Sequence, residues 1–269
     1  MHYSPRFVIA GLVFDIPTMI MTVVTSLVVI LFVLYLSRKL SAGVPNGRQN
    51  VLEWVIDFVT GIAGNFMDAK TATKFVTLAF TLFLYIFIGN QLGVVLNVNT
   101  SHHNAHGHEM SESVKEMLTV SGKEEDAQKK LEHLNEELND PHGHVVIAWW
   151  KSPTATPSVT FALAFLVLIY SHILGIRKSA GGWFKNVFLN PIHLLEELII
   201  KPLTMPLRLF GNIFAGEVLI AFLLGTGVLI GTLPMIAWLG YSLFVGSVQA
   251  FIFVTLAMVY ISQQVNDHH

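Results

Sequence analysis

Residues 201–225 read KPLTMPLRLFGNIFAGEVLIAFLLG, and this stretch decides how the chain has to fold. From residue 202 to residue 266 the only formally charged side chains are Arg208 and Glu217, in a sequence apolar enough to lie in a bilayer. A charged group at membrane depth costs several kcal/mol unless it is compensated, so we interpret Arg208 as a functional residue. On one helix the two charges would lie on opposite faces, about 13 Å apart along the axis. Each therefore needs its own partner or its own water.

The composition indicates an integral membrane protein. Of the 269 residues, 53% are hydrophobic and only 13% are charged, and the mean hydropathy is +0.59. These values lie outside the usual balance of a soluble domain. The sequence has no cysteine, which excludes disulfides, thiolate metal sites and a cysteine nucleophile. It also has no basic patch interleaved with aromatic residues, so we expect no nucleic-acid partner.

Three apolar runs, residues 18–36, 75–96 and 159–176, are long enough to cross a hydrocarbon core of about 30 Å. We expect the first to be a retained helix, because it lacks a short apolar region followed by a small-residue cleavage site. Basic residues mark one end of each run: Arg38, Lys39 and Arg48 after the first, Lys70 and Lys74 before the second, and Arg177 and Lys178 after the third. Cytoplasmic loops carry such an excess, so the N-terminus is expected outside.

Between the first two runs, residues 50–70 predict an amphipathic helix along the cytoplasmic interface. Apolar residues recur there at helical intervals, with acidic residues among them: Leu52, Val55, Ile56, Val59 and Ile62, with Glu53, Asp57 and Asp68.

The polar segment at residues 99–149 differs from the rest of the chain. It holds ten of the 18 acidic residues and seven of the 12 histidines, including His102, His103, His106 and His108. We interpret it as a solvated outer loop with a short helix near residues 111–138. Metal binding is the weaker alternative because no ligand geometry is fixed, so we expect no metal or cofactor. Proton collection at the surface is a further hypothesis.

A hairpin of two long helices is expected from residue 188 to the C-terminus. Residues 190–224 would form a helix about 50 Å long, which exceeds the hydrocarbon thickness and predicts a strongly tilted or bent helix. A glycine-rich turn from Gly225 to Pro234 precedes a return helix at about residues 235–262. The expected fold is an all-α membrane protein with three spans, one interfacial helix and this tilted hairpin, and a cytoplasmic C-terminus. Its parts are residues 1–98, 99–150, 151–187 and 188–269.

The return helix predicts a polar stripe, because Ser242, Gln249 and Tyr260 fall within about 20° of one another. Antiparallel pairing about the turn sets Arg208 at the depth of Gln249, and Glu217 at the depth of Ser242. The hairpin then offers a carboxylate to an outer aqueous path and a guanidinium at mid-depth.

Simpler interpretations of these polar residues remain open. Gln249, Ser242 and Asn212 also suit ordinary interhelical hydrogen bonds, and Glu217 could be protonated and structural. Asn90, near the end of the second span, is a candidate to line an outer cavity. The sequence HLLEE at 193–197 lacks the second histidine of a metalloprotease signature.

At these residues the chain resembles subunit a of F-type ATP synthases. The resemblance lies in LRLFGN at 207–212, AGE at 215–217 and QAFIF at 249–253, with Asn190-Pro191 and Lys201-Pro202 in matching places. It implies a bacterial plasma-membrane subunit without catalytic activity of its own. The implied partners are a ring of c subunits, the b-subunit peripheral stalk, the remaining ATP synthase subunits and the lipid bilayer.

The resemblance also implies residue roles in two aqueous half-channels that couple proton flow to rotation and ATP synthesis. Arg208 would be the essential arginine facing the ring, Glu217 would line the outer half-channel, and Asn212 and Gln249 would line the path near the arginine. Two features depart from the family: the long acidic, His-rich outer loop, and Ser242 where some members have a titratable histidine.

Two rival classes are a self-contained transporter or channel and an intramembrane hydrolase. The first would move a solute without partners after purification. The second lacks a recognisable pair of nucleophile and base or a complete metal set.

Overall fold

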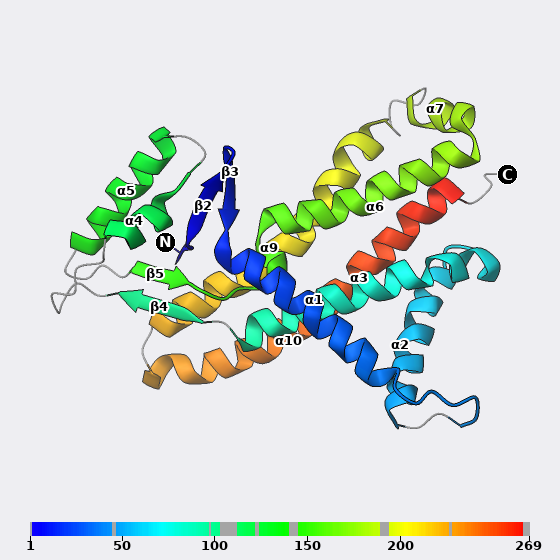
Figure 1. Ribbon diagram of the computed structural model, residues 1–269, viewed down its shortest axis with the longest axis horizontal. Helices are drawn as coiled ribbons and strands as arrows, with labels where there is room; N and C mark the ends of the chain where they lie inside the picture. The colour runs from blue at the N-terminus through cyan, green and yellow to red at the C-terminus, as the bar shows by residue number, and fades with distance from the viewer. Residues whose placement is uncertain are drawn as a thin grey trace. The chain divides into compact units, whose positions relative to one another are not determined.

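The computed structural model describes residues 2–44, 47–96, 98–102, 112–121, 124–139, 145–188, 194–225 and 228–265, most of them helical (Figure 1). The described chain has five helices long and apolar enough to cross a membrane: α1 (Ile16–Leu36), α3 (Ala69–Val95), α6 (Pro157–Lys178), α9 (Lys201–Gly225) and α10 (Val228–Val265). The chain divides into two compact units. Unit 1 comprises Met1–Val24 and Leu92–Pro153, and unit 2 comprises Thr25–Gln91 and Thr154–His269.

Unit 1 contains a small β-sheet, so the expectation of an all-α chain was wrong in this region. The strands β1 (His2–Tyr3), β5 (Val145–Ala148) and β4 (Asn99–His102) form the sheet in that order, β1 parallel and β4 antiparallel to β5. The helices α4 (Glu112–Thr119) and α5 (Glu124–Asn139) replace the single helix expected near residues 111–138. Six buried side chains form a separate core: Tyr3, Leu118, Leu134, Leu138, Val145 and Ile147. The described residues of this polar segment therefore belong to a folded unit rather than only to a solvated loop.

A β-hairpin precedes the first long helix. Its strands, β2 (Arg6–Ile9) and β3 (Leu12–Asp15), pair antiparallel with Ile9 opposite Leu12. Ala10 and Gly11 form the turn with φ values of 52° and 79°. Positive φ at both central residues is typical of a tight turn whose twist matches that of the strands, which explains glycine at position 11.

Asp15 joins the hairpin to α1. Its carboxylate accepts hydrogen bonds from the Thr18 backbone N–H at 3.0 Å and the Thr18 hydroxyl at 2.7 Å, and so caps the first turn of the helix. Ser4 Oγ donates to it at 2.5 Å and Lys151 Nζ at 2.9 Å. Burial alone would raise the pKa of Asp15, but the Lys151 ammonium and these hydrogen bonds outweigh burial and hold the pKa below its usual value. Asp15 is therefore a charged residue that links Ser4, Lys151 and the first turn of α1 within unit 1.

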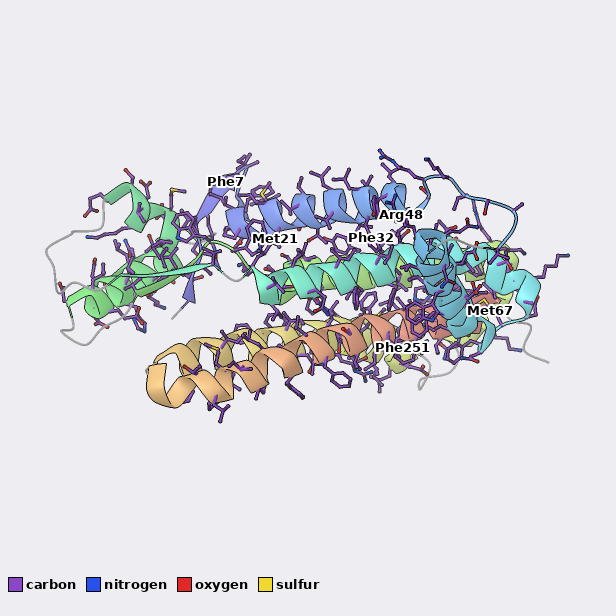
Figure 2. The ribbon with its side chains drawn as sticks, turned by 90° about the horizontal axis from the view of Figure 1, so that it is seen from below. Phe7, Met21, Phe32, Arg48, Met67 and Phe251 are labelled. Carbon is purple, nitrogen blue, oxygen red and sulfur yellow. The ribbon has the colours of Figure 1, made fainter. Side chains whose placement is uncertain are left out.

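In unit 2, α2 (Gly47–Gly64) ends six residues before the expected limit, and α3 begins six residues before its expected start. The boundary is set by Asp68, whose carboxylate accepts the backbone N–H of Thr71 at 3.0 Å as an N-cap. Figure 1 shows α2 running across the direction of α3, and Figure 2 labels Met67 in the turn between them. Phe58 on α2 packs on Phe251 of α10 with ring centroids 5.9 Å apart.

The remaining helices of unit 2 follow the expected order with different limits. Pro157 stands in the first turn of α6, where its missing N–H is harmless. A helix that was not expected, α7 (Ala180–Phe188), follows α6. The π-helical turn η3 (Glu196–Ile200) leads directly into α9. The expected start of the return helix at residue 235 was wrong: α10 is helical from Val228, with Pro234 inside it.

The core of unit 2 lies between α3, α6, α9 and α10. Its larger fully buried side chains include Ile86, Met205, Leu209, Phe253, Met258 and Ile261. Gly246 lets α10 approach α3 closely, since a Cβ there would lie 3.1 Å from Asn90 Cβ.

Gly93→Ala should destabilise unit 1. An added Cβ would lie 2.4 Å from Ser152 Cβ and 2.6 Å from its Cα, so backbone must shift. We expect a loss of about 1 to 3 kcal/mol in unfolding free energy, measured by chemical denaturation in detergent micelles. Gly61→Ala is the control, because an added Cβ meets nothing within 4 Å and alanine favours the helix. Equal stability of the two variants would contradict the close packing of Gly93.

Asp15→Asn should make unit 1 less stable at neutral pH. It should also remove the loss of stability that protonation of Asp15 causes in acid. Because the folded-state pKa lies below the unfolded value of about 3.8, the stabilisation is complete above that value and disappears as the pH falls through the folded-state pKa. Hydrogen exchange in residues 4–18 should therefore be faster in the variant at pH 7, and wild type should approach it below about pH 4. Asp126→Asn, on exposed α5, should behave like wild type.

Candidate functional site

Arg208 lies on the exposed side of α9. The opposite side of the helix is buried through Met205, Leu209 and Ile213, which recur every four residues and pack into the core. Arg208 itself is exposed and, within the part of the chain that the structure describes, forms no ion pair. A guanidinium cannot discharge itself by losing its proton. Its positive charge is therefore not compensated by any side chain among the described residues.

One turn beyond Arg208, a hydrogen bond joins the two hairpin helices. Asn212 Nδ2 donates to Gln249 Oε1 at 2.8 Å, and Gln249 is buried. The bond places Gln249 of α10 beside α9 near the depth of Arg208, as the antiparallel pairing predicts. This bond holds the Gln249 amide oxygen against Asn212, one helical turn from Arg208 in sequence.

A second contact between α9 and α10 lies near Gly216. Trp238 Nε1 donates to the Gly216 carbonyl at 3.2 Å. Ser242 is buried, and its Oγ has no hydrogen-bond partner among the described residues. This Oγ lies 3.8 Å from the position of a Cβ on Gly216, so Ser242 faces the backbone next to Glu217. The backbone of Glu217 belongs to α9, and its side chain lies outside the described part of the structure.

Asn90 is fully buried where α3 meets α10. Its Nδ2 donates to the Gly246 carbonyl at 3.0 Å, and its Oδ1 accepts the Thr154 hydroxyl at 2.5 Å. The neighbouring Gln91 Nε2 donates to Ser247 Oγ at 2.9 Å. Both ends of the Asn90 amide are satisfied, so its clearest role is to hold α3 against α10.

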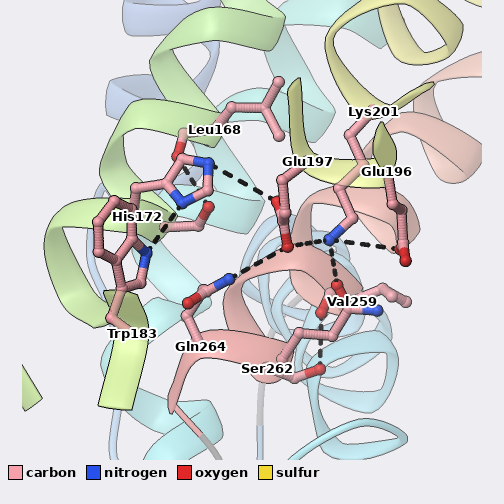
Figure 3. A network of polar contacts seen from close by, with 11 residues as sticks. Leu168, His172, Trp183, Glu196, Glu197, Lys201, Val259, Ser262 and Gln264 are labelled. Atoms are coloured by element: carbon pink, nitrogen blue, oxygen red, sulfur yellow. Dashed lines mark hydrogen bonds and ion pairs between the residues drawn. The ribbon is translucent and has the colours of Figure 1, made fainter. Parts of the chain in front are cut away.

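The most connected polar cluster of unit 2 centres on Lys201, which was not predicted to be a site residue. Lys201 Nζ lies 2.5 Å from Glu197 Oε1 and 2.7 Å from Gln263 Oε1, and its side chain is only 4% exposed (Figure 3). Glu196 Oε1 lies 3.5 Å from the same ammonium. Tyr260, the last residue of the expected polar stripe, places its ring 5.1 Å from Lys201 Nζ. The cluster thus joins the beginning of α9 to the end of α10.

His172 of α6 extends this cluster to a third helix. Its Nδ1 accepts the indole N–H of Trp183 at 3.2 Å, and its Nε2 lies 3.6 Å from Glu197 Oε2. With Nδ1 accepting, the proton of a neutral ring sits on Nε2 and faces the carboxylate. Gln264 Nε2 also donates to Glu197, at 3.3 Å. Glu197 is therefore bound by groups from α6, α9 and α10.

The sequence contains one signal that predicts part of this cluster. Glu197 and Lys201 are four residues apart, the spacing at which opposite charges meet on one helical face. The segment was considered only as an incomplete metalloprotease signature. In the described residues, no group of three metal-binding side chains is placed to hold an ion. The histidines at 103, 106 and 108 lie outside the described residues.

The predicted polar stripe of α10 is found on one side of the helix, because Ser242, Gln249 and Tyr260 are all buried against the rest of unit 2. Ser242 and Gln249 face α9 at Gly216 and Asn212, whereas Tyr260 faces the Lys201 cluster. The three polar residues of the stripe therefore have three different neighbours: the backbone at Gly216, the side chain of Asn212 and the Lys201 cluster.

Comparison with known proteins gives consistent relatives. The family described as "ATP synthase A chain" matches residues 19–262. Proteins named "ATP synthase subunit a" from Priestia megaterium and Anoxybacillus flavithermus are 35% and 36% identical, each alignment covering 100% of this chain and 99% of the relative. The protein of that name from Bacillus subtilis is 34% identical, over 96% of both chains.

The Glu197–Lys201 pair should stabilise unit 2 only while both charges are present. Removing one partner leaves an unpaired buried charge, so Lys201→Met should lower the free energy of unfolding by about 3 to 5 kcal/mol. The double variant with Glu197→Leu and Lys201→Met should recover most of that free energy. Thermal unfolding followed by tryptophan fluorescence would measure the cycle. The exposed pair Glu112–Lys115 is the control, with a coupling below about 1 kcal/mol. Additive effects of the two core changes would contradict the pairing.

Proposed function

The chain belongs to the ATP synthase A chain family, and from this membership we propose that it is the proton-conducting stator subunit of a bacterial rotary ATP synthase. In this proposal it forms two aqueous half-channels against a ring of c subunits and couples proton flow to rotation and ATP synthesis. It has no catalytic activity alone. Its other partners are the b-subunit peripheral stalk and the remaining subunits of the complex.

The observation that carries the proposal is that two cations on α9 differ in burial and in ion pairing. Lys201 is buried and paired, whereas Arg208, seven residues later, is exposed and has no ion pair with a described residue. An exposed guanidinium at membrane depth requires a negative group, and a carboxylate on a ring passing this face would supply it. Arg208 would attract each ring carboxylate after it releases its proton and would keep the two half-channels electrically separate.

The exposed side of α9 supports a ring contact. Besides Arg208 it presents small or apolar residues together with two uncharged polar ones: Thr204, Leu207, Asn212, Ala215, Val218 and Phe222. A ring whose carboxylates are protonated while they face lipid has an apolar surface. The exposed side of α9 would therefore slide on that surface and would form no charge pair other than the one at Arg208. In this proposal the Asn212–Gln249 hydrogen bond keeps both amides beside the arginine, where they line the path.

The outer half-channel would run along Glu217 and Ser242. The buried Ser242 hydroxyl lacks a partner among the described residues and lies beside the backbone of residue 216, so a water there would satisfy it. Such a water suits Ser242 better than a direct relay, since a hydroxyl does not titrate near neutral pH. Asn90 would border the path and fix α3 on α10. Tyr260 belongs to the inner end, where its ring covers Lys201.

The proposed topology follows the distribution of basic residues. The ends of α1 and α6 near Arg38 and Arg177 are cytoplasmic, α2 lies along that interface, and α9 with α10 forms a tilted hairpin. The N-terminus is then outside and the C-terminus cytoplasmic. Each proton that crosses 100 mV supplies about 2.3 kcal/mol, so several protons are needed for each ATP.

Arg208→Ala should abolish ATP-driven acidification of vesicles that contain the assembled complex, while ATP hydrolysis by the detached catalytic head persists. Arg208→Lys should also fail to restore normal rates, because an ammonium in apolar surroundings can lose its proton and a guanidinium cannot. Arg177→Ala, an exposed cation at the end of α6, is the matched control and should pump normally. Acidification at normal rates by Arg208→Ala would refute the proposal.

A further inference from the structure

The tip of the β2–β3 hairpin is an exposed apolar surface that the proton path does not use. The hairpin sequence from residue 7 to residue 14 is FVIAGLVF, without one polar side chain. Ile9 and Leu12 at the tip are 59% and 64% exposed, and Val8 and Val13 behind them are also exposed. Isolated exposed aliphatic residues are ordinary, but four neighbours on one turn form a patch.

Both faces of this tip are apolar. Side chains alternate along a strand, so Ile9 and Leu12 share the face of the stacked Phe7 and Phe14 rings, whose centroids are 5.3 Å apart. Val8 and Val13, paired across the strands, occupy the other face. A protein partner that docks on a sheet face would cover one side of the tip. A surface apolar on both sides suits an occupant that surrounds it.

The base of the hairpin is fixed where α1 begins. Asp15 ends β3 and caps α1, and Arg6 Nε lies 3.6 Å from its carboxylate. The first turns of α1 expose Met19, Ile20 and Val23, which on a membrane span face lipid. Four residues of strand extend about 13 Å, so the tip stays within that distance of the level at which α1 enters the bilayer. The apolar tip therefore continues the lipid-facing surface of α1.

We propose that the β2–β3 hairpin is a membrane foot, whose tip from Val8 to Val13 inserts among the lipids of the leaflet that α1 enters first. The backbone limits its depth. Each strand of a two-stranded ribbon has outward N–H and C=O groups without a strand partner, and these are too costly to place in hydrocarbon. The tip therefore lies among headgroups and the first acyl carbons, while the charged base at Arg6 and Asp15 stays in water. The foot holds unit 1 at the membrane surface.

Site-directed spin labelling tests this proposal directly, because the chain has no cysteine of its own. Ile9→Cys and Leu12→Cys would each be labelled with a nitroxide in the assembled complex, reconstituted in nanodiscs of phosphatidylcholine and phosphatidylglycerol. Power saturation compares collision with oxygen, which concentrates in lipid, and with a water-soluble nickel chelate. Val23→Cys on α1 is the lipid control, and Gln128→Cys on exposed α5 is the water control. Labelled complex with the unmodified chain gives the background from other subunits.

We expect both tip labels to collide with oxygen as Val23→Cys does and to exclude the nickel chelate at least several-fold better than Gln128→Cys. Nickel access equal to the water control would place the tip in water and overturn the proposal. Exclusion of both reagents would show that protein covers the tip, and would overturn it equally. Adding Ile9→Ser to the Leu12→Cys variant should raise nickel access, since it removes apolar surface from the inserted face. ATP-driven acidification by the labelled variants would verify assembly separately, because the foot is not part of the proton path.

Discussion

A positive charge in apolar surroundings is the constraint on which this chain is built. Two cations meet it on α9, two helical turns apart, and they are treated in opposite ways. Lys201 is surrounded by Glu197, Glu196 and Gln263 and covered by the ring of Tyr260. Arg208 is exposed and has no charged partner within the described chain. The first cation joins the beginning of α9 to the end of α10, and in the proposed function the second faces the ring.

Much of this arrangement could be predicted from composition and spacing. Uninterrupted apolar runs predict membrane helices because hydrocarbon leaves few alternatives for the backbone, and five such helices are found. The isolation of Arg208 and Glu217 predicts that α9 carries the function, and this stays a prediction. Antiparallel pairing about the turn placed Gln249 within one helical turn of its observed neighbour, Asn212. These predictions depend on the helical period and on the lengths of the apolar runs, and both can be read from a single sequence.

What sequence reasoning missed depends on contacts between distant segments. The Lys201 cluster draws on α6, α9 and α10, and no local pattern connects His172 with Gln264. The sheet of unit 1 pairs residues 2–3 with residues 146–147, which are separated by more than half of the chain. Its strands are two to four residues long, too short for a period of two to stand out against neighbouring apolar runs. Proline was misleading at residue 234, since a helix can contain it when neighbouring groups satisfy the freed carbonyl.

The π-helical turn at Glu196–Ile200 holds one residue more than an ordinary turn of helix. Removing that extra residue would turn the segment into ordinary α-helix while the helices on either side keep their own faces, but it would also change the spacing of Glu197 and Lys201. The distance in sequence between the segment before α9 and the arginine can therefore drift during evolution by one position without rotating Arg208 away from its surface.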